Sequence, residues 1–176
     1  PRSQIRARVW AWTRETEIDA AFFRDRVRAA LANRPGIGTG ADEGCRLLHG
    51  EADGLPGVVA DRYADTVVLQ LTSAGAEHWR ESIVDALADA TGCKQVYERS
   101  DVEIRTLEGL AAFAGARSGE VPAALIEIRE PGVRFLVDVV AGQKTGFYLD
   151  QRENRARIQA LAQDRDVLNG FCYTGG

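Results

Sequence analysis

The sequence predicts an α+β fold, consisting of a central mixed-sheet domain with two to three helices. Short segments of alternating apolar residues indicate strands, most clearly at residues 133–139. Other segments carry apolar residues at the i, i+4, i+7 spacing of an amphipathic helix. With 176 residues and 45% hydrophobic content, the chain is long enough to form one domain with a real core.

The composition indicates a cytoplasmic protein rather than a membrane-spanning or secreted one. The net charge of −4 gives no global sign of nucleic-acid or membrane binding, although a local basic patch is compatible with it. No apolar run approaches the ~20 residues that span a bilayer, and the first residues lack a signal-peptide core. Three scattered cysteines without metal-site spacing indicate reduced thiols, so we expect a cytoplasmic protein with no membrane contact. The absence of methionine leads us to expect an internal piece of a longer chain.

The first half of the chain alternates between strand and helix patterns. Residues 3–12 place apolar and basic side chains on opposite faces, which predicts a strand. A helix is expected next, with Thr16 and Asp19 as a capping pair and Pro35 just after its end. Residues 45–71 carry two or three short strands. A second helix is predicted by an apolar stripe of Trp79, Ile83, Ala86, Leu87 and Ala90.

The second half continues with strand-like segments at residues 95–99 and 124–128, followed by the alternating residues 133–140. Residues 141–150 are expected to form a loop and a strand. A third helix is predicted from Gln151 to Gln163, with Asp150 as N-cap and Glu153 completing a capping box. The last apolar segment, "DVLNGF", predicts a strand that begins a further βα unit.

Several motifs favour structural over functional interpretations. The glycine-rich residues 36–44 follow a helix rather than a strand, so a loop is favoured over a phosphate-binding turn. His49 and His78 have no partner at metal-site spacing. Cys45 is interpreted as a small buried thiol rather than a nucleophile. For the charge-rich residues 98–105, an ion-paired surface and a functional role both remain open.

The segment "GQKTGFYLDQRENR" is more informative. It places five candidate substrate-binding residues around two glycines and a helix N-terminus: Lys144, Tyr148, Gln151, Arg152 and Arg155. Cations beside a helix N-terminus are unfavourable unless an anion is present, and a tyrosine ring can stack on a base. The alternative, a charged helix start with an aromatic core anchor, is equally compatible with these residues.

The final segment, "VLNGFCYTGG", places polar residues and glycines after a predicted strand, where ligands bind in open α/β sheets. The candidate cofactor-binding residues are Asn169, Phe171, Tyr173, Thr174 and Gly175. A dinucleotide site would also need an acidic residue about 20 residues further along. By itself, the motif is compatible with several nucleotide-like cofactors.

Taken together, several stretches resemble one known family. They are "SQIRARVW", "GEADGLPGVVADRY", "LQLTSAGAE", "ERSDVEIRTLEGL", "GQKTGFYLDQREN" and "VLNGFCYTGG". Their order is similar to that in the ribosomal RNA large subunit methyltransferase I family, which makes 5-methylcytosine in large-subunit ribosomal RNA with S-adenosylmethionine. The resemblance covers nearly the whole chain. Cys172 and Gln143 stand where this family commonly has serine and histidine.

The resemblance implies a division into three parts. Residues 1–14 would end a PUA-like RNA-binding module, residues 15–165 would form the central α+β domain, and residues 166–176 would supply the first strand of a truncated Rossmann-like methyltransferase domain. The family's nucleophilic cysteine and Asp-Pro-Pro motif would lie beyond this sequence, so no catalytic residue is assigned. S-adenosylmethionine would be the cofactor and ribosomal RNA the partner, and a homodimer is left open.

The implied function has two competitors. A non-catalytic RNA-binding or interaction module would use the basic residues near both ends, and a dinucleotide-dependent enzyme would need a different continuation of the chain. We expect the chain alone to be inactive in methyl transfer. We also expect residues 167–176 to pair irregularly or to be poorly ordered, because a lone strand leaves its backbone groups unpaired.

Overall fold

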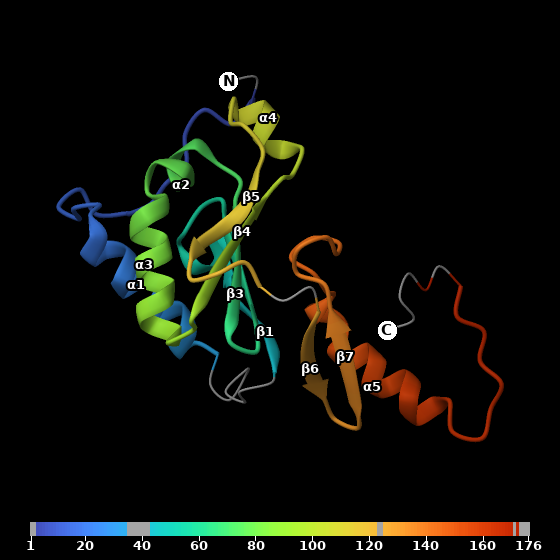
Figure 1. Cartoon of the computed structure of the whole chain (residues 1–176). Coiled ribbons are helices and arrows are strands. Elements are labelled where there is room, and N and C mark those ends of the chain that lie inside the picture. Colours follow the sequence, from blue (N-terminus) through green and yellow to red (C-terminus); the bar gives the residue numbers. More distant parts are fainter. Residues whose placement is uncertain (1–2, 35–42, 123–124, 171, 173–176) are drawn as a thin grey trace.

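A computed structural model describes residues 3–34, 43–122, 125–170 and 172. Its centre is a sheet in which five strands lie in the order of the sequence (Figure 1). Neighbouring strands are antiparallel except β3 and β4, which are parallel. The predicted α+β fold with a mixed central sheet is therefore confirmed. The strands are β1 (Gly44–His49), β2 (Val58–Tyr63), β3 (Thr66–Leu71), β4 (Gln95–Ser100) and β5 (Phe113–Ser118).

Two helices, α1 (Ala20–Ala32) and α3 (Arg80–Thr91), cover one face of this sheet (Figure 1). They enclose the larger of two apolar cores with the inward side chains of the strands, which alternate along each strand. Two short helices, α2 (Ala74–His78) and α4 (Ile104–Glu108), lie at one end of the sheet, and a 3₁₀ turn, η1 (Gly50–Asp53), follows β1. Both long predicted helices of the first half are thus present.

The caps of these helices agree with the sequence in part. Asp19 is the N-cap of α1, and its carboxylate accepts a hydrogen bond of 2.8 Å from the backbone N–H of Phe22. Thr16 does not join this cap, because its hydroxyl is hydrogen-bonded to that of Thr13. Gly92 ends α3 in the left-handed conformation, with a φ of 65°, which favours glycine.

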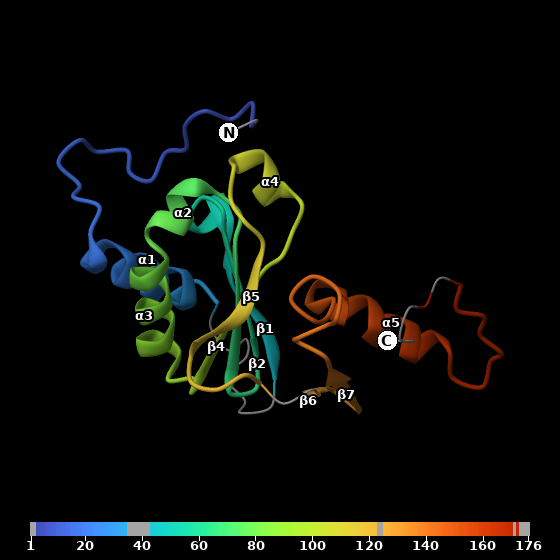
Figure 2. The ribbon, with the colours of Figure 1, turned by 45° about the horizontal axis from the view of Figure 1, so that its top comes forward.

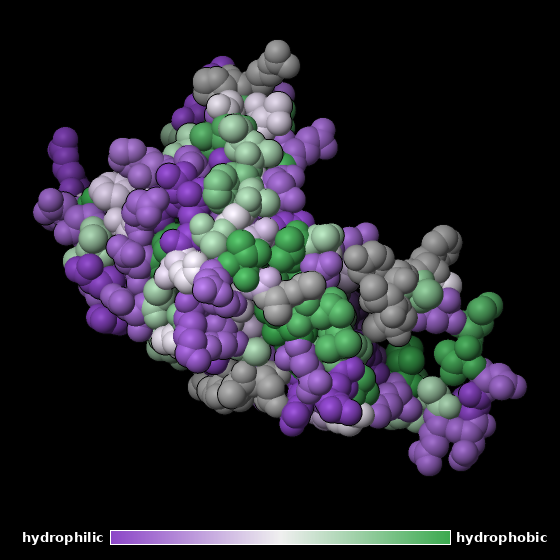
Figure 3. Space-filling view, viewed as in Figure 1, coloured by the Kyte–Doolittle hydropathy of each residue, from purple (hydrophilic) through white to green (hydrophobic). Residues whose placement is uncertain are grey.

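The opposite face of the sheet is covered by a hairpin and a loop (Figure 2). The hairpin consists of β6 (Ile126–Glu130) and β7 (Val133–Val137), joined by the tight turn Pro131-Gly132. The loop over residues 138–148 leads into η2 (Leu149–Gln151) and α5 (Arg152–Leu161). A second, smaller core lies between these parts and the sheet, formed by Tyr63, Val68, Ile128, Val137 and Val139. Figure 3 shows hydrophobic side chains on the surface near the hairpin, where Leu136 is 65% exposed.

The predicted strand at residues 3–12 is wrong. The segment has no regular structure and runs past α4, where the backbone N–H of Ser3 donates to the carbonyl of Leu107 at 2.8 Å. Its tryptophan, Trp10, packs edge-on against Phe23 of α1, with 5.4 Å between the ring centroids. This segment is therefore held by side-chain packing and a few polar contacts, and not by the strand-to-strand hydrogen bonds that its alternating pattern predicts.

Three expectations for the second half also differ from the structure. Residues 141–148 form a turn-rich loop rather than a strand. Gln151, not Asp150, is the N-cap of α5, and no side-chain cap is formed, because the Asp150 carboxylate instead accepts a hydrogen bond from the Gln151 amide. Residues 166–170 are not a strand, and Leu168 is 96% exposed. In the described part of the chain these residues have no neighbouring strand with which to pair.

The charge-rich residues 98–105 are only in part a solvated surface, because Asp101 and Glu103 are exposed and other charged side chains are not. Glu98 and Arg99 are buried in β4, and Arg105 is buried in α4. Each is paired: Glu98 with Arg117, Arg99 with Asp101, and Arg105 with Glu77. Within the described ranges, no helix is long and apolar enough to cross a membrane. The division into three parts stays a prediction.

Candidate functional site

Lys144 and Tyr148 lie on the loop over residues 138–148. Lys144 is exposed and Tyr148 half-buried, with 4.5 Å between the Lys144 ammonium nitrogen and the centroid of the Tyr148 ring. The Tyr148 hydroxyl donates to the side-chain carbonyl of Gln143 at 2.5 Å. A cation, an aromatic ring and an amide are therefore gathered on one loop, which is a set of groups suited to phosphate and base.

A buried polar network holds the second half of this loop to β2. The hydroxyl of Thr145 donates to the carboxylate of Asp61 at 2.6 Å, and Asp61 also receives two hydrogen bonds from Arg46. The hydroxyl of Tyr63 lies 3.0 Å from that of Thr145 and accepts from the backbone N–H of Phe147 at 3.1 Å. Asp61 and Tyr63 are both fully buried, so the network lies away from solvent.

The electrostatics of this network are fixed by burial. Burial first, and then the charge of Asp61, raises the pKa of Tyr63, so its hydroxyl keeps its proton. The hydrogen bonds that Arg46 donates to the Asp61 carboxylate raise the pKa of Arg46. Because the one proton of Thr145 goes to Asp61, the Tyr63 hydroxyl can donate its own proton to Thr145 or to the carbonyl of Phe147, which lies 3.4 Å away.

Arg99 of β4 holds the first half of the loop. Its guanidinium donates to the carbonyls of Val139 and Gly142, each at 3.1 Å, and is paired with Asp101. Arg99 is only 7% exposed. Within the loop, the carboxylate of Asp138 accepts from the backbone N–H groups of residues 140 and 141. The loop is therefore attached to two different strands.

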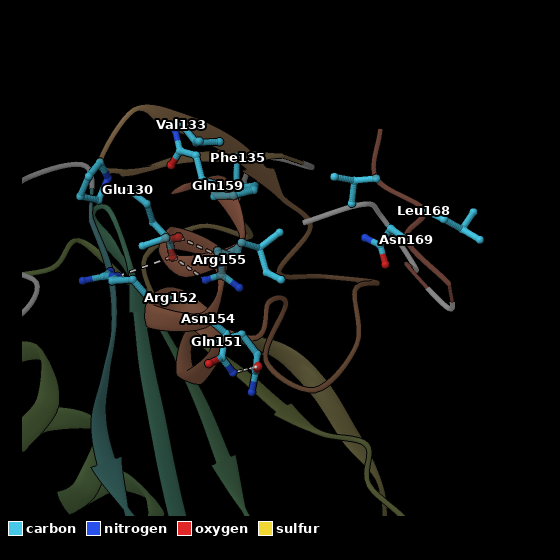
Figure 4. Close-up of a pocket in the computed structure, with 14 residues that line it drawn as sticks. Glu130, Val133, Phe135, Gln151, Arg152, Asn154, Arg155, Gln159, Leu168 and Asn169 are labelled. Atoms are coloured by element: carbon cyan, nitrogen blue, oxygen red, sulfur yellow. Dashed lines mark hydrogen bonds and ion pairs between the residues drawn. The ribbon is translucent and has the colours of Figure 1, made fainter. Parts of the chain in front are cut away.

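Arg152 and Arg155 meet at one buried carboxylate, that of Glu130 in β6 (Figure 4). Arg155 donates two hydrogen bonds to Glu130, at 2.8 and 2.5 Å, and another to the carbonyl of Tyr148 at 3.0 Å. Its guanidinium also lies 4.6 Å from the ring centroid of Phe147. Arg152 donates to the carbonyl of Gly44 in β1 at 2.5 Å. Both arginines fasten α5 to the rest of the domain.

A hollow of about 530 Å³ lies beside α5. Figure 4 shows Gln151, Arg152 and Arg155 on one side of it and Leu168 and Asn169 on the other. The structure thus brings three of the predicted substrate-binding residues together with one predicted cofactor-binding residue. Lys144 and Tyr148 are not among the residues that line the hollow. Phe171, Tyr173, Thr174 and Gly175 lie outside the described residues.

The cysteines give no sign of a nucleophile. Burial raises the pKa of Cys45 to about 11, so its thiol stays protonated at neutral pH. Cys93 is also buried, whereas Cys172 is exposed. Over the parts of the chain that the structure describes, no group of three or more histidine, cysteine, aspartate or glutamate side chains could hold a metal ion.

The sequence reasoning missed the residues that hold the loop. Asp61, Tyr63, Arg99 and Thr145 were not singled out for this role. One signal was present: Asp61 occurs in a strand pattern, "VVADRY", at a position that alternation with Tyr63 places on one face. A buried carboxylate needs a partner, so such a position predicts a polar attachment.

The chain is similar to several curated proteins over nearly its whole length. It is 50% identical to ribosomal RNA large subunit methyltransferase I of Shewanella denitrificans and 49% identical to that of Shewanella frigidimarina. In each case the match covers 99% of this chain and 44% of the relative. By sequence, the chain is similar to the ribosomal RNA large subunit methyltransferase I family. The resemblance found in its motifs is thereby confirmed, and the chain spans less than half the length of these methyltransferases.

Two further comparisons agree with this relationship. Residues 111–176 match the family described as S-adenosylmethionine-dependent methyltransferase. The fold is similar to the crystal structure of a proposed methyltransferase in complex with SAH, with a TM-score of 0.69 and 22% identity. That match covers 82% of this chain and 36% of the other. The structural likeness concerns the fold.

Proposed function

We propose that the chain is the central part of an S-adenosylmethionine-dependent methyltransferase that makes 5-methylcytosine in large-subunit ribosomal RNA. The observation that carries the proposal is the 50% identity, over 99% of the chain, to a protein named ribosomal RNA large subunit methyltransferase I. The choice of 5-methylcytosine as product follows from the resemblance of the motifs. The loop over residues 138–148 supports it, because it offers a cation and an aromatic ring to RNA. This activity places the protein with ribosomal RNA in the cytoplasm, and whether it dimerises is left open.

The proposed chemistry needs a nucleophile that the chain does not supply. A cysteine thiolate must first add to carbon 6 of cytosine, after which carbon 5 takes the methyl group from the sulfonium. A base then removes the carbon-5 proton, and the thiolate leaves carbon 6, which restores the double bond of the ring. Cys45 is protonated and buried, and Cys93 is buried. Cys172 is exposed, but it stands where the family that the motifs resemble commonly has serine. In this proposal the described residues therefore bind and orient RNA, and the nucleophile comes from the part of the methyltransferase beyond this chain.

S-adenosylmethionine would supply the methyl group. Of the residues proposed to bind it, the structure describes only Asn169, which lies exposed at the edge of the hollow beside α5. The described residues alone do not form a cradle for an adenosyl group.

The proposed RNA-binding residues divide into two groups. Lys144, Tyr148 and Gln151 expose a cation, part of a ring and an amide, which can contact a phosphate, stack on a base and bond a base edge. Arg152 and Arg155 are already paired with Glu130, so they are proposed to contact RNA only with the donors left over. Of these residues, Lys144 is the one that we most directly expect to contact an RNA phosphate, because its ammonium group is exposed.

The test is RNA binding by the chain, measured by fluorescence anisotropy with fragments of large-subunit ribosomal RNA. We expect affinity to fall with salt, and Lys144→Ala to weaken binding and to reduce the salt slope by about 1. Lys94→Ala is the matched control, since Lys94 is exposed, pairs with Asp65 and is the other of the two lysines in the chain. If Lys144→Ala and the unaltered chain bind RNA with equal affinity, Lys144 does not contact the RNA.

A non-catalytic RNA-binding or interaction module remains the second candidate, and it would use the basic residues near both ends of the chain, among them Arg8, Lys144 and Arg157. Both candidates predict that the chain alone transfers no methyl group from radiolabelled S-adenosylmethionine to ribosomal RNA. Transfer by the purified chain would contradict the proposed division of roles. A longer protein containing this chain should methylate the RNA under the first candidate and leave it unmodified under the second.

A further inference from the structure

The loop over residues 138–148 adopts one specific and locally unfavourable conformation. Lys144 has a φ of 55°, in the left-handed region that residues with a Cβ rarely adopt. Gly146 has a φ of 135°, and a Cβ added to Gly142 would collide with the carbonyl of Asp138. Strained conformations of this kind persist only when the surrounding structure fixes them.

Two separate attachments provide that fixation. At one end of the loop, Arg99 of β4 binds the carbonyls of residues 139 and 142. At the other end, Thr145 binds Asp61 of β2, and the N–H of residue 147 binds Tyr63. Lys144 lies between the two attachments. All four anchoring side chains are at least 90% buried, so water does not compete for these bonds.

We propose that Arg99 and the Asp61–Thr145 pair are positioning residues for RNA binding, which hold the loop over residues 138–148 so that Lys144 and Tyr148 face the RNA. This inference rests on the proposed function. A loop that is ordered before binding loses less conformational freedom when the RNA arrives. Binding residues that are held in one conformation by packing and hydrogen bonds from their neighbours also place their polar groups more accurately. The loop is thus a fixed platform on the sheet rather than a segment that becomes ordered on closure.

The two lysines of the chain allow a direct test of the attachment. Endoproteinase Lys-C cleaves after lysine, so Lys144 reports on the loop and Lys94, between α3 and β4, reports on the rest of the fold. Cleavage within an ordered loop requires local opening. Thr145→Val removes the hydroxyl that binds Asp61 and should increase the rate of cleavage at Lys144 about 5- to 30-fold. Cleavage at Lys94 should not change.

Two matched variants control this experiment. Thr145→Ser keeps the hydroxyl and should restore slow cleavage at Lys144. Thr66→Val makes the same substitution at another buried threonine, whose hydroxyl donates to Gln95 at 2.9 Å, and should leave cleavage at Lys144 unchanged. If Thr145→Val leaves the rate of cleavage at Lys144 unchanged, the proposal that the Thr145–Asp61 hydrogen bond holds the loop is wrong.

RNA binding then separates positioning from the proposed function. The double variant Arg99→Met, Thr145→Val loses both attachments and should bind large-subunit ribosomal RNA fragments as weakly as Lys144→Ala. If Lys144→Ala binds weakly and the double variant binds like the unaltered chain, the positioning role is wrong and the proposed function stands. If Lys144→Ala binds normally, Lys144 makes no RNA contact and the positioning role is wrong, whereas the proposed function fails if the unaltered chain shows no salt-dependent binding to these fragments. If the double variant unfolds, cleavage at Lys94 will also accelerate. In that case, the rates of cleavage at Lys144 in Thr145→Ser and Thr145→Val show whether the Thr145 hydroxyl holds the loop.

Discussion

The two faces of the central sheet are built on different principles. On the helical face, the core between the helices and the sheet is almost entirely apolar and includes Phe23 of α1 and Leu69 of β3, which are fully buried. On the other face, the loop over residues 138–148 is held by buried polar groups, chiefly Asp61 and Arg99. Figure 2 shows the two coverings on opposite sides of the sheet.

The difference indicates what each face contributes. Apolar packing is non-directional, so the helical face stabilises the domain without dictating a particular loop conformation. Buried hydrogen bonds are directional and costly when left unmade, so they select one conformation of the backbone that they hold. We infer that the helical face supplies stability and the loop face supplies specificity.

The largest effect is expected on the helical face, from Phe23→Ala. Phe23 is fully buried, and its ring contacts those of Trp10, Phe22 and Trp79, with centroids 5.3 to 5.4 Å apart. The substitution leaves a cavity and should lower the free energy of unfolding by about 4 kcal/mol, measured by urea denaturation. Leu136→Ala, at a residue that is 65% exposed, should change it by less than about 0.5 kcal/mol. Similar losses in both variants would contradict the contrast.

A smaller effect on stability is expected from Asp61→Ala on the loop face. It leaves Arg46 and Thr145 without their common partner and should cost about 2 to 3 kcal/mol, since Arg46 is partly exposed and can regain water. Asp61→Asn keeps one acceptor and should cost less. The contrast would be weakened if Asp61→Ala destabilised the protein without accelerating Lys-C cleavage at Lys144.

The apolar half of the fold could be predicted from the sequence. The stripe containing Val27 and the alternation at Val137 identified α1 and β7, because burial imposes a period on hydrophobic residues. The strand predicted at residues 3–12 was wrong because an alternating pattern does not show whether a neighbouring strand is present to pair with it. The strand β5 was missed because its sequence, "FAGARS", carries a single large apolar side chain and is nowhere fully buried.

The site was harder to predict than the fold. The segment containing Lys144 and Tyr148 was identified by its residue types, and their proximity was found only in the structure. Arg152 and Arg155 were predicted to contact substrate, and the structure pairs both with Glu130, which is 25 positions away from Arg155 in the sequence. Their role in RNA binding stays a prediction. Long-range polar pairs leave no periodic pattern, so reasoning from local sequence does not reveal them.

Native-state hydrogen exchange tests the central claim most directly. The backbone N–H groups of Gly142, Gly146 and Phe147 are hydrogen-bonded within the loop or to Tyr63, whereas Leu168 is 96% exposed and outside any strand or helix. If the loop is a fixed platform, these three amides should exchange at least about a hundredfold more slowly than that of Leu168, and Thr145→Val should erase most of the difference at Phe147. Exchange of all three at the rate of Leu168 would contradict a platform held from beneath by Asp61, Tyr63 and Arg99.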